Sequence, residues 1–129
     1  LCTGLVFVRS EFAIAHVRDG ASNTYLIGEK YVSPDNYATG MCKGDNQSPY
    51  HGDDRDSVRF TGSAGQPLPP RQDQGGADLS WNFGSAHSGG FNMSMCDGSV
   101  RTISYAINPT VHKNLGHRAS AAVIPGDAF

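Results

Sequence analysis

The sequence has no apolar run that could cross a bilayer and no cluster of basic residues. Its longest apolar runs, such as Gly4 to Val8, are far shorter than the roughly 20 residues that span a membrane. No signal peptide is visible, and the formal net charge is −2. Nucleic-acid binding therefore has no electrostatic support. The chain begins at Leu1 rather than Met, so we expect its natural N-terminus to lie upstream.

Common catalytic signatures are missing as well. The segment Gly84 to His87 (GSAH) lacks the G-x-S-x-G frame of a hydrolase nucleophile elbow, and neither a phosphate loop nor a carboxylate dyad is present. The three cysteines, Cys2, Cys42 and Cys96, form neither a CxxC pair nor a zinc-ligand pattern. Their odd number leaves at least one of them unpaired within the chain. The sequence therefore predicts a protein that is not an enzyme.

Composition favours short strands over a helical bundle. Residues 1–129 suffice for a single domain with one modest core. Charged residues make up 17% of the chain and there are 16 glycines, which fits short strands joined by long loops. We predict an α+β, β-rich fold: an antiparallel sheet of short strands with long irregular loops and a short C-terminal helix.

The stretch from Trp81 to Ser104 carries the strongest local signal, because two alternating runs flank Asp97-Gly98. Such a pair is typical of a β-hairpin with a type I′ turn, which needs positive φ at both central residues. Phe91, Met93 and Met95 share one face of the first predicted strand. The two faces are not cleanly apolar and polar, so we expect burial on both sides of part of the hairpin.

The same stretch resembles a known family. Nine residues separate His87 from Asp97-Gly98, within FGSAHSGG (83–90) and DGSVR (97–101). Upstream, DGASNT (19–24) precedes Gly28-Glu29, and the tail from 115 to 127 is also similar. Together these motifs resemble the prepilin-type processing-associated H-x9-DG family (domain of unknown function 1559), with Ala21 in place of the usual Thr. The motif residues are Asp19, Gly20, Ser22, Asn23, Thr24, Glu29, His87, Asp97 and Gly98.

The resemblance implies a pilin-like globular head of an exported protein. Pseudopilin-like proteins of type II secretion and type IV pili usually begin with a leader and a hydrophobic helix, which here would lie upstream of Leu1. We therefore expect an extracellular or envelope location, a membrane anchor only through that helix, and other pilin-like subunits or exported proteins as partners. For an exported protein we expect one disulfide, Cys2 with Cys42, because Cys96 sits in a strand next to the turn.

The first quarter of the chain predicts three strands and a corner. The expected strands are Gly4 to Val8, Phe12 to Val17 with a half-buried His16, and Tyr25 to Tyr31. Between them, Asp19 is expected to accept local backbone hydrogen bonds as an Asx-turn or N-cap. Ser22, Asn23 and Thr24 favour an ordered irregular turn. Glu29 is expected to be a paired or capped carboxylate rather than a general base.

The long middle segment, Ser33 to Ser80, shows little periodicity and many prolines. Ser57 to Thr61 could form an edge strand, and Gln66 to Gly76 is expected to be exposed and extended. The carboxylates of His51 to Asp56 could bind Ca²⁺, but they do not match the EF-hand spacing. We favour a solvated acidic loop, partly neutralised by Arg55 and Arg59, and assign no cofactor.

The C-terminal part predicts a short helix. Asn108 is a plausible N-cap before Pro109, and Pro109 to His117 then carries an apolar stripe at Val111 and Leu115. Gly116 or its neighbours should end the helix. A further short strand is expected at 123–124.

His87 and Asp97 are the tempting chemical pair, since an imidazole beside a carboxylate can begin acid–base catalysis or a metal site. A whole strand separates them, so they can meet only if the entry loop folds back. We favour a His87 that packs on the sheet and bonds to a neighbouring polar group. Trp81 is expected in the core rather than in a sugar-binding platform.

We therefore expect a non-enzymatic, envelope-exported, pseudopilin-like protein that acts in assembly or surface display through protein–protein contacts. Two alternatives remain open. One is an extracellular glycan- or peptide-binding module that uses Trp81 and the middle loop, and the other is a secreted metal-dependent hydrolase that uses His87 and the acidic loop.

Overall fold

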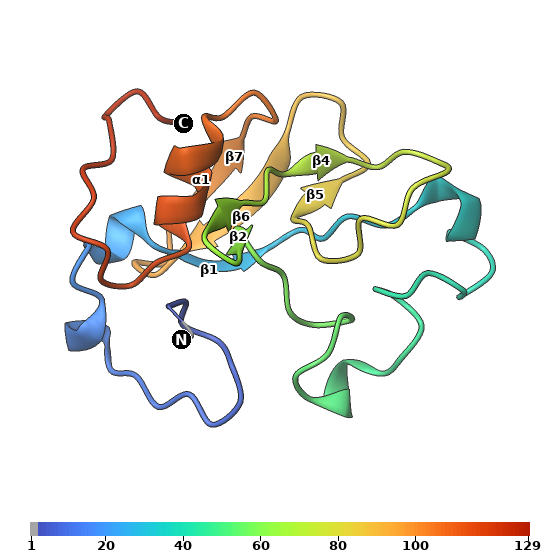
Figure 1. Cartoon of the computed structure of the whole chain (residues 1–129), viewed down its shortest axis with the longest axis horizontal. Coiled ribbons are helices and arrows are strands. Elements are labelled where there is room, and N and C mark those ends of the chain that lie inside the picture. The colour runs from blue at the N-terminus through green and yellow to red at the C-terminus, as the bar shows by residue number, and fades with distance from the viewer. Residues whose placement is uncertain (1–2) are drawn as a thin grey trace.

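The computed structural model describes residues 3–129, so Leu1 and Cys2 lie outside the described residues. Most of this chain is irregular, with short strands and one short C-terminal helix, which confirms the predicted fold class. The strands, the helix and the connecting loops are drawn in Figure 1. None of the described helices is long and apolar enough to cross a membrane.

A three-stranded antiparallel sheet forms the centre of the molecule. Its strands are β1 (Tyr25–Gly28), β6 (Phe91–Met95) and β7 (Val100–Ile103), in the order β1-β6-β7. A register shift between Tyr25 and Ile27 interrupts the pairing of β1 with β6. The alternation in β6 is as predicted, because its three apolar side chains are all buried while the two between them are half-buried. Burial on both faces, however, does not occur.

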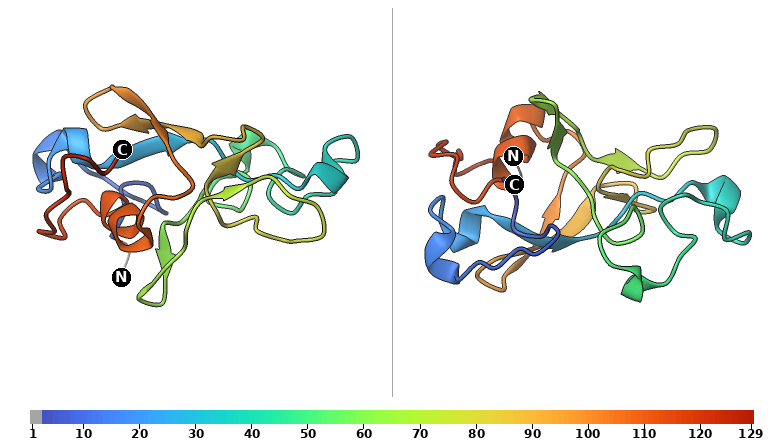
Figure 2. Two further views of the ribbon diagram at one scale, coloured as in Figure 1. Left: turned by 90° about the horizontal axis from the view of Figure 1, so that it is seen from above. Right: turned by 60° about the horizontal axis from the view of Figure 1, so that its bottom comes forward.

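The core lies between one face of this sheet and α1 (Pro109–Leu115). Leu115 of the helix packs with Phe91, Met93 and Ile103 of the sheet, and Figure 2 shows the helix against the sheet from two further directions. The other face carries Ile27 and Val100, each 70% exposed. Both are cross-strand neighbours of Ser94 in β6, so they lie on either side of the same residue on this face.

The hairpin is confirmed, but its predicted turn type is wrong. Met95 accepts a hydrogen bond from the Gly98 amide at 3.0 Å and donates one to Ser99 at 2.8 Å. Gly98 has φ +86°, whereas Asp97 is not among the described residues with positive φ. This is a three-residue loop in which Gly98 forms the bulge. Both central residues have positive φ instead at Ala64 and Gly65, in the hairpin of β2 (Gly62–Ser63) and β3 (Gln66–Pro67).

The remaining pair of strands is parallel, which the sequence analysis did not predict. It joins β4 (Arg71–Gln72) to β5 (Gly84–Ser85). Gly84 is required there, because an added Cβ would lie 2.0 Å from the carbonyl oxygen of Arg71. Pro70, immediately before β4, is fully buried, whereas the rest of 66–76 is exposed or half-buried, so the expectation of an exposed segment fails only at Pro70.

The predicted C-terminal helix is confirmed. The Asn108 side chain accepts hydrogen bonds from the amides of Thr110 and Val111 at 2.9 and 3.3 Å, as an N-cap should. Pro109 follows at the first helical position, and Gly116 ends the helix.

Four predicted strands do not form: 4–8, 12–17, 57–61 and 123–124. The second contains η1 (Ile14–His16), a single 3₁₀ turn. There the His16 ring is exposed rather than half-buried, and its Nδ1 accepts the amide of Ala13 at 3.0 Å. Each of these segments lacks a partner strand, and β propensity needs cross-strand neighbours to act. The described residues form three further 3₁₀ turns: η2 (Ala21–Asn23), η3 (Pro34–Asn36) and η4 (Pro49–His51).

Candidate functional site

Two motif residues far apart in the sequence meet at the start of β6. The Glu29 carboxylate accepts the Asn92 amide at 2.6 Å, and the Glu29 amide donates to the Asn92 carbonyl at 3.0 Å. The other oxygen of Glu29 lies 3.6 Å from Nε2 of His87. Glu29 is thus a paired carboxylate that fixes the junction of β1 with β6.

His87 itself does not pack on the sheet, because its side chain is 67% exposed. The His87 backbone, in contrast, is fixed by hydrogen bonds. The His87 amide donates to the Ser85 hydroxyl at 3.1 Å, and its carbonyl accepts the Tyr105 hydroxyl at 3.0 Å. The Ser85 hydroxyl also donates to the Gly90 carbonyl at 3.0 Å. The FGSAHSGG loop is therefore closed on itself, with the imidazole turned outward.

The other two motifs meet at the opposite end of β6. The amides of Cys96 and Asp97 donate to the carbonyls of Thr24 and Ala21 at 2.9 and 3.2 Å. Thr24 is fully buried and its hydroxyl donates to the Gly20 carbonyl at 3.1 Å. Ser22 and Asn23 lie in η2, which confirms the ordered turn. The DGASNT segment thus supports the tip of the hairpin.

The Asp97 side chain caps its own turn. Its carboxylate accepts the hydroxyl and the amide of Ser99 at 2.6 and 2.9 Å. These hydrogen bonds, the hydroxyl first, lower the pKa of Asp97. The five-residue β6 strand, about 16 Å long, separates it from His87, whose nearest charged group is Glu29.

Asp19 makes long-range contacts rather than the local cap predicted for it. Its carboxylate accepts the Ser120 amide at 2.6 Å, the Ser120 hydroxyl at 2.7 Å and the Ala121 amide at 2.9 Å. Burial alone would raise the pKa of Asp19, but these hydrogen bonds outweigh it and lower the pKa. Asp19 therefore fastens the C-terminal tail to the corner before β1.

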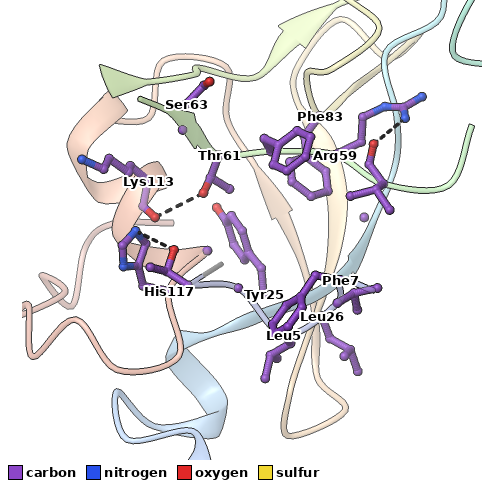
Figure 3. A pocket seen from close by; sticks show the side chains of 18 of the residues that line it. Leu5, Phe7, Tyr25, Leu26, Arg59, Thr61, Ser63, Phe83, Lys113 and His117 are labelled. Atoms are coloured by element: carbon purple, nitrogen blue, oxygen red, sulfur yellow. Dashed lines mark hydrogen bonds between the residues drawn. The ribbon is translucent and has the colours of Figure 1, made fainter. Parts of the chain in front are cut away.

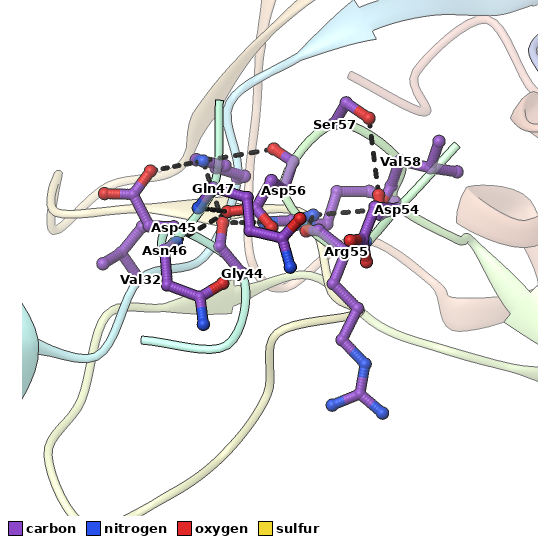
Figure 4. Close-up of polar contacts among 12 residues, drawn as sticks. Val32, Gly44, Asp45, Asn46, Gln47, Asp54, Arg55, Asp56, Ser57 and Val58 are labelled. Carbon is purple, nitrogen blue, oxygen red and sulfur yellow. Dashed lines mark hydrogen bonds and ion pairs between the residues drawn. The ribbon is translucent and has the colours of Figure 1, made fainter. Parts of the chain in front are cut away.

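The acidic segment at 51–56 is organised by amides and by a lysine. Asp56 is buried, and its Oδ1 accepts the amides of Asn46 and Gln47 at 2.6 and 2.9 Å (Figure 4). Lys30 donates to Asp45 at 2.5 Å and to the carbonyls of Gly44 and Asp56 at 2.8 and 3.2 Å. Within residues 3–129, no three His, Cys, Asp or Glu side chains converge to hold a metal ion.

Of the two arginines expected to neutralise this loop, only Arg55 acts elsewhere. The Arg55 guanidinium lies 4.6 Å from the centre of the Trp81 ring. Arg59 donates to the carbonyls of Arg55, Val58 and Gly44. Burial lowers the pKa of Arg59, and the nearby charges of Cys42, Asp56 and Asp45 oppose that effect. Trp81 is partly exposed rather than in the core, so that prediction is wrong. Because Arg55 covers its ring, Trp81 is not an open stacking platform for a sugar.

A groove of about 900 Å³ lies beside β1. Its walls come from the N-terminal segment, from β1, from residues 56–65 and from the end of α1 (Figure 3). Leu5, Phe7 and Leu26 lie together along one side, and Phe83 and Arg59 lie across from Lys113. Grooves that bind ligands commonly enclose about 300–1,000 Å³. No sequence motif marked this groove, because its walls come from these four segments and from Phe83, all separate in the sequence.

His112 was also missed. It is fully buried between α1 and the sheet, and burial lowers its pKa to about 4. Its Nδ1 lies 3.3 Å from the Tyr25 hydroxyl, while its Nε2 has no hydrogen-bond partner among the described residues. A histidine at this helical position gives no sequence signal of burial beyond its spacing from Leu115.

The proposed Cys2–Cys42 disulfide involves a residue outside the described residues, so it stays a prediction. Cys42 is buried. Cys96 is half-buried, and burial followed by the charge of Asp97 raises the pKa of its thiol.

Comparisons with known proteins identify the family. A family model described as a protein of unknown function (DUF1559) matches residues 2–110, which contain every motif residue named above. Curated proteins and solved structures gave no match. Because the model covers most of the 129 residues, the chain belongs to the DUF1559 family.

Proposed function

We propose that this chain is the globular head of a non-enzymatic, envelope-exported, pseudopilin-like protein that acts in assembly through protein–protein contacts. Its partners are other pilin-like subunits or exported proteins, and its membrane anchor is an N-terminal hydrophobic helix. The observation that carries the proposal is the ordered set of H-x9-DG family motifs within the matched residues 2–110.

The use of the motif residues supports a role without catalysis. Asp97, Asp19 and Glu29 are occupied by hydrogen bonds that close the hairpin tip, the tail and the start of β6. The Ser85 hydroxyl, two residues before His87, already contacts the Gly90 carbonyl and the Tyr105 hydroxyl, both at 3.0 Å. These residues therefore stabilise the fold, and the protein's exposed surface remains available for contacts with partners.

The exposed apolar residues of the sheet support a contact surface. Ile27 and Val100 are each 70% exposed on the face that α1 does not cover. Exposed apolar side chains that lie together mark protein interaction sites more often than singly scattered ones do.

Photo-crosslinking in cells tests the proposal. A photoreactive amino acid at Val100 of the full-length protein should capture pilin-like subunits or exported proteins. The same substitution at Val123, which is 90% exposed in the tail, is the control and should capture them much less. Equal capture from both positions, or none from Val100, would contradict the proposal.

A further inference from the structure

We propose that the groove beside β1 accepts an extended peptide segment of a partner protein as an added strand, with apolar side chains and at least one carboxylate. This inference rests on the proposed function, because it names the kind of segment through which a partner would be bound. The groove is the one described above and drawn in Figure 3.

The open edge of β1 provides the backbone template. Among the described strands, β1 has β6 on one side and none on the other. Just beyond Gly28 that other side is occupied: Lys30 bridges to Phe83, and the Gly84 amide donates to the Glu29 carbonyl at 3.1 Å. The groove begins where this pairing stops, at residues 25–28. A strand added there would pair with β1 on the same side on which residues 82–84 pair with residues 29–31.

The walls of the groove favour apolar side chains. Leu5, Phe7 and Leu26 face the space from one side and Phe83 from the other (Figure 3). In strand addition, backbone hydrogen bonds supply affinity and such pockets select alternate side chains of the peptide. A segment that alternates apolar with polar residues would bury only its apolar face here.

Charge selects among such segments. Arg59 and Lys113 line the groove, and their hydrogen bonds go to carbonyl oxygens rather than to carboxylates. The Nε of Arg59 is buried and has no partner among the described residues. Asp56 also lines the groove: its Oδ1 accepts the loop amides of Asn46 and Gln47, while its Oδ2 is buried without a partner among the described residues. Lys30 lines the groove as well, so three cationic side chains stand against this one carboxylate. The groove therefore carries an excess of positive charge that a peptide carboxylate would complement.

Selection from a random seven-residue peptide library, displayed on phage against the full-length protein, tests the inference. We expect enrichment of sequences that alternate apolar and polar residues and contain Asp or Glu. The selected peptide is then resynthesised in two forms, one N-methylated at its odd-numbered amides and one at its even-numbered amides. In each form the methyl groups prevent strand pairing along one edge of the peptide. We expect one of the two forms to bind about tenfold more weakly than the unmethylated peptide, because several backbone hydrogen bonds to β1 are lost. No enrichment, enrichment of basic sequences, or equal binding of both N-methylated registers would overturn the proposal.

A matched pair of charge-reversal variants tests whether the peptide binds in the groove. Lys113→Glu should weaken binding at least about threefold, since it reverses a charge inside the groove. Lys43→Glu makes the same change on an exposed side chain paired with Asp78, outside the groove, and should leave affinity unchanged. Equal effects of the two variants would overturn the groove assignment.

The two proposals fail separately. Crosslinking of Val100, which lies outside the groove, to pilin-like subunits without peptide binding would overturn the groove alone. Peptide binding without such crosslinks would support the groove and contradict the pseudopilin-like role.

Discussion

Lowering the pH should destabilise this protein through His112 in particular. The ring is fully buried, with the rings of Tyr25, Phe83 and Phe91 centred 5.4, 6.0 and 6.0 Å away. No acidic side chain of residues 3–129 pairs with it, so burial penalises its charged form and lowers its pKa from 6.5 to about 4.

The magnitude and sign follow from linkage. Between pH 6.5 and about 4 the unfolded chain binds a proton at His112 that the folded chain does not, so stability falls as the pH falls. The contribution is complete above pH 6.5 and lost by about pH 4. A difference of about 2.5 pKa units corresponds to roughly 3 kcal/mol in the free energy of unfolding. Against typical stabilities of about 5–15 kcal/mol, that loss is large.

Urea denaturation of the wild type and of His112→Leu at pH 7.5, 6.5, 5.5 and 4.5 measures this term. Leucine fills most of the same space and does not titrate, while the carboxylates are common to both proteins. The variant should lose some stability at pH 7.5, where Tyr25 loses its partner, yet should equal or exceed the wild type near pH 4.5. Parallel pH profiles of the two proteins would refute the assignment of the buried histidine.

Three further changes have defined outcomes. Gly84→Ala should cost about 1–3 kcal/mol or prevent folding, since its Cβ would meet the carbonyl of β4, whereas Gly89→Ala in the same motif has open space and should be tolerated. Glu29→Ala should cost about 1–3 kcal/mol by leaving an amide unpaired, and His87→Ala less than about 0.5 kcal/mol. Ala64→Asn should stabilise by up to about 1 kcal/mol, because Ala64 has φ +48°. Thermal and urea unfolding measure all of them.

Each of these has a result that contradicts it. Equal tolerance of alanine at both glycines would mean that β4 and β5 do not approach as described. A loss from His87→Ala as large as that from Glu29→Ala would show that the imidazole holds the loop. Destabilisation by Ala64→Asn would exclude the positive-φ turn.

Local pattern predicted the elements that local forces stabilise. The hairpin follows from alternation around Asp97-Gly98, and the helix follows from the Asn108-Pro109 start and the spacing of Val111 and Leu115. In both, the residues that determine the element are neighbours along the chain. The turn type was wrong because Asp-Gly also suits a three-residue loop in which only the glycine has positive φ.

Sequence patterns could not predict contacts between distant segments. Asp19 carries the residue type of a local cap, but its carboxylate finds Ser120, 101 residues away. Glu29 and His87 lie on different motifs, and only the register of β1 with β6 brings them together. The segment 4–8 has strand propensity but no strand to pair with among the described residues, and residues 4–7 form one wall of the groove instead.

The most direct test of the central claim is mass spectrometry of the N-terminal peptide of the native, full-length protein isolated from cell envelopes. The pseudopilin-like account predicts a trimmed leader followed by an N-methylated hydrophobic residue at the head of an apolar helix. An ordinary signal-peptidase end, with no hydrophobic helix retained, would contradict it and would indicate a free secreted domain.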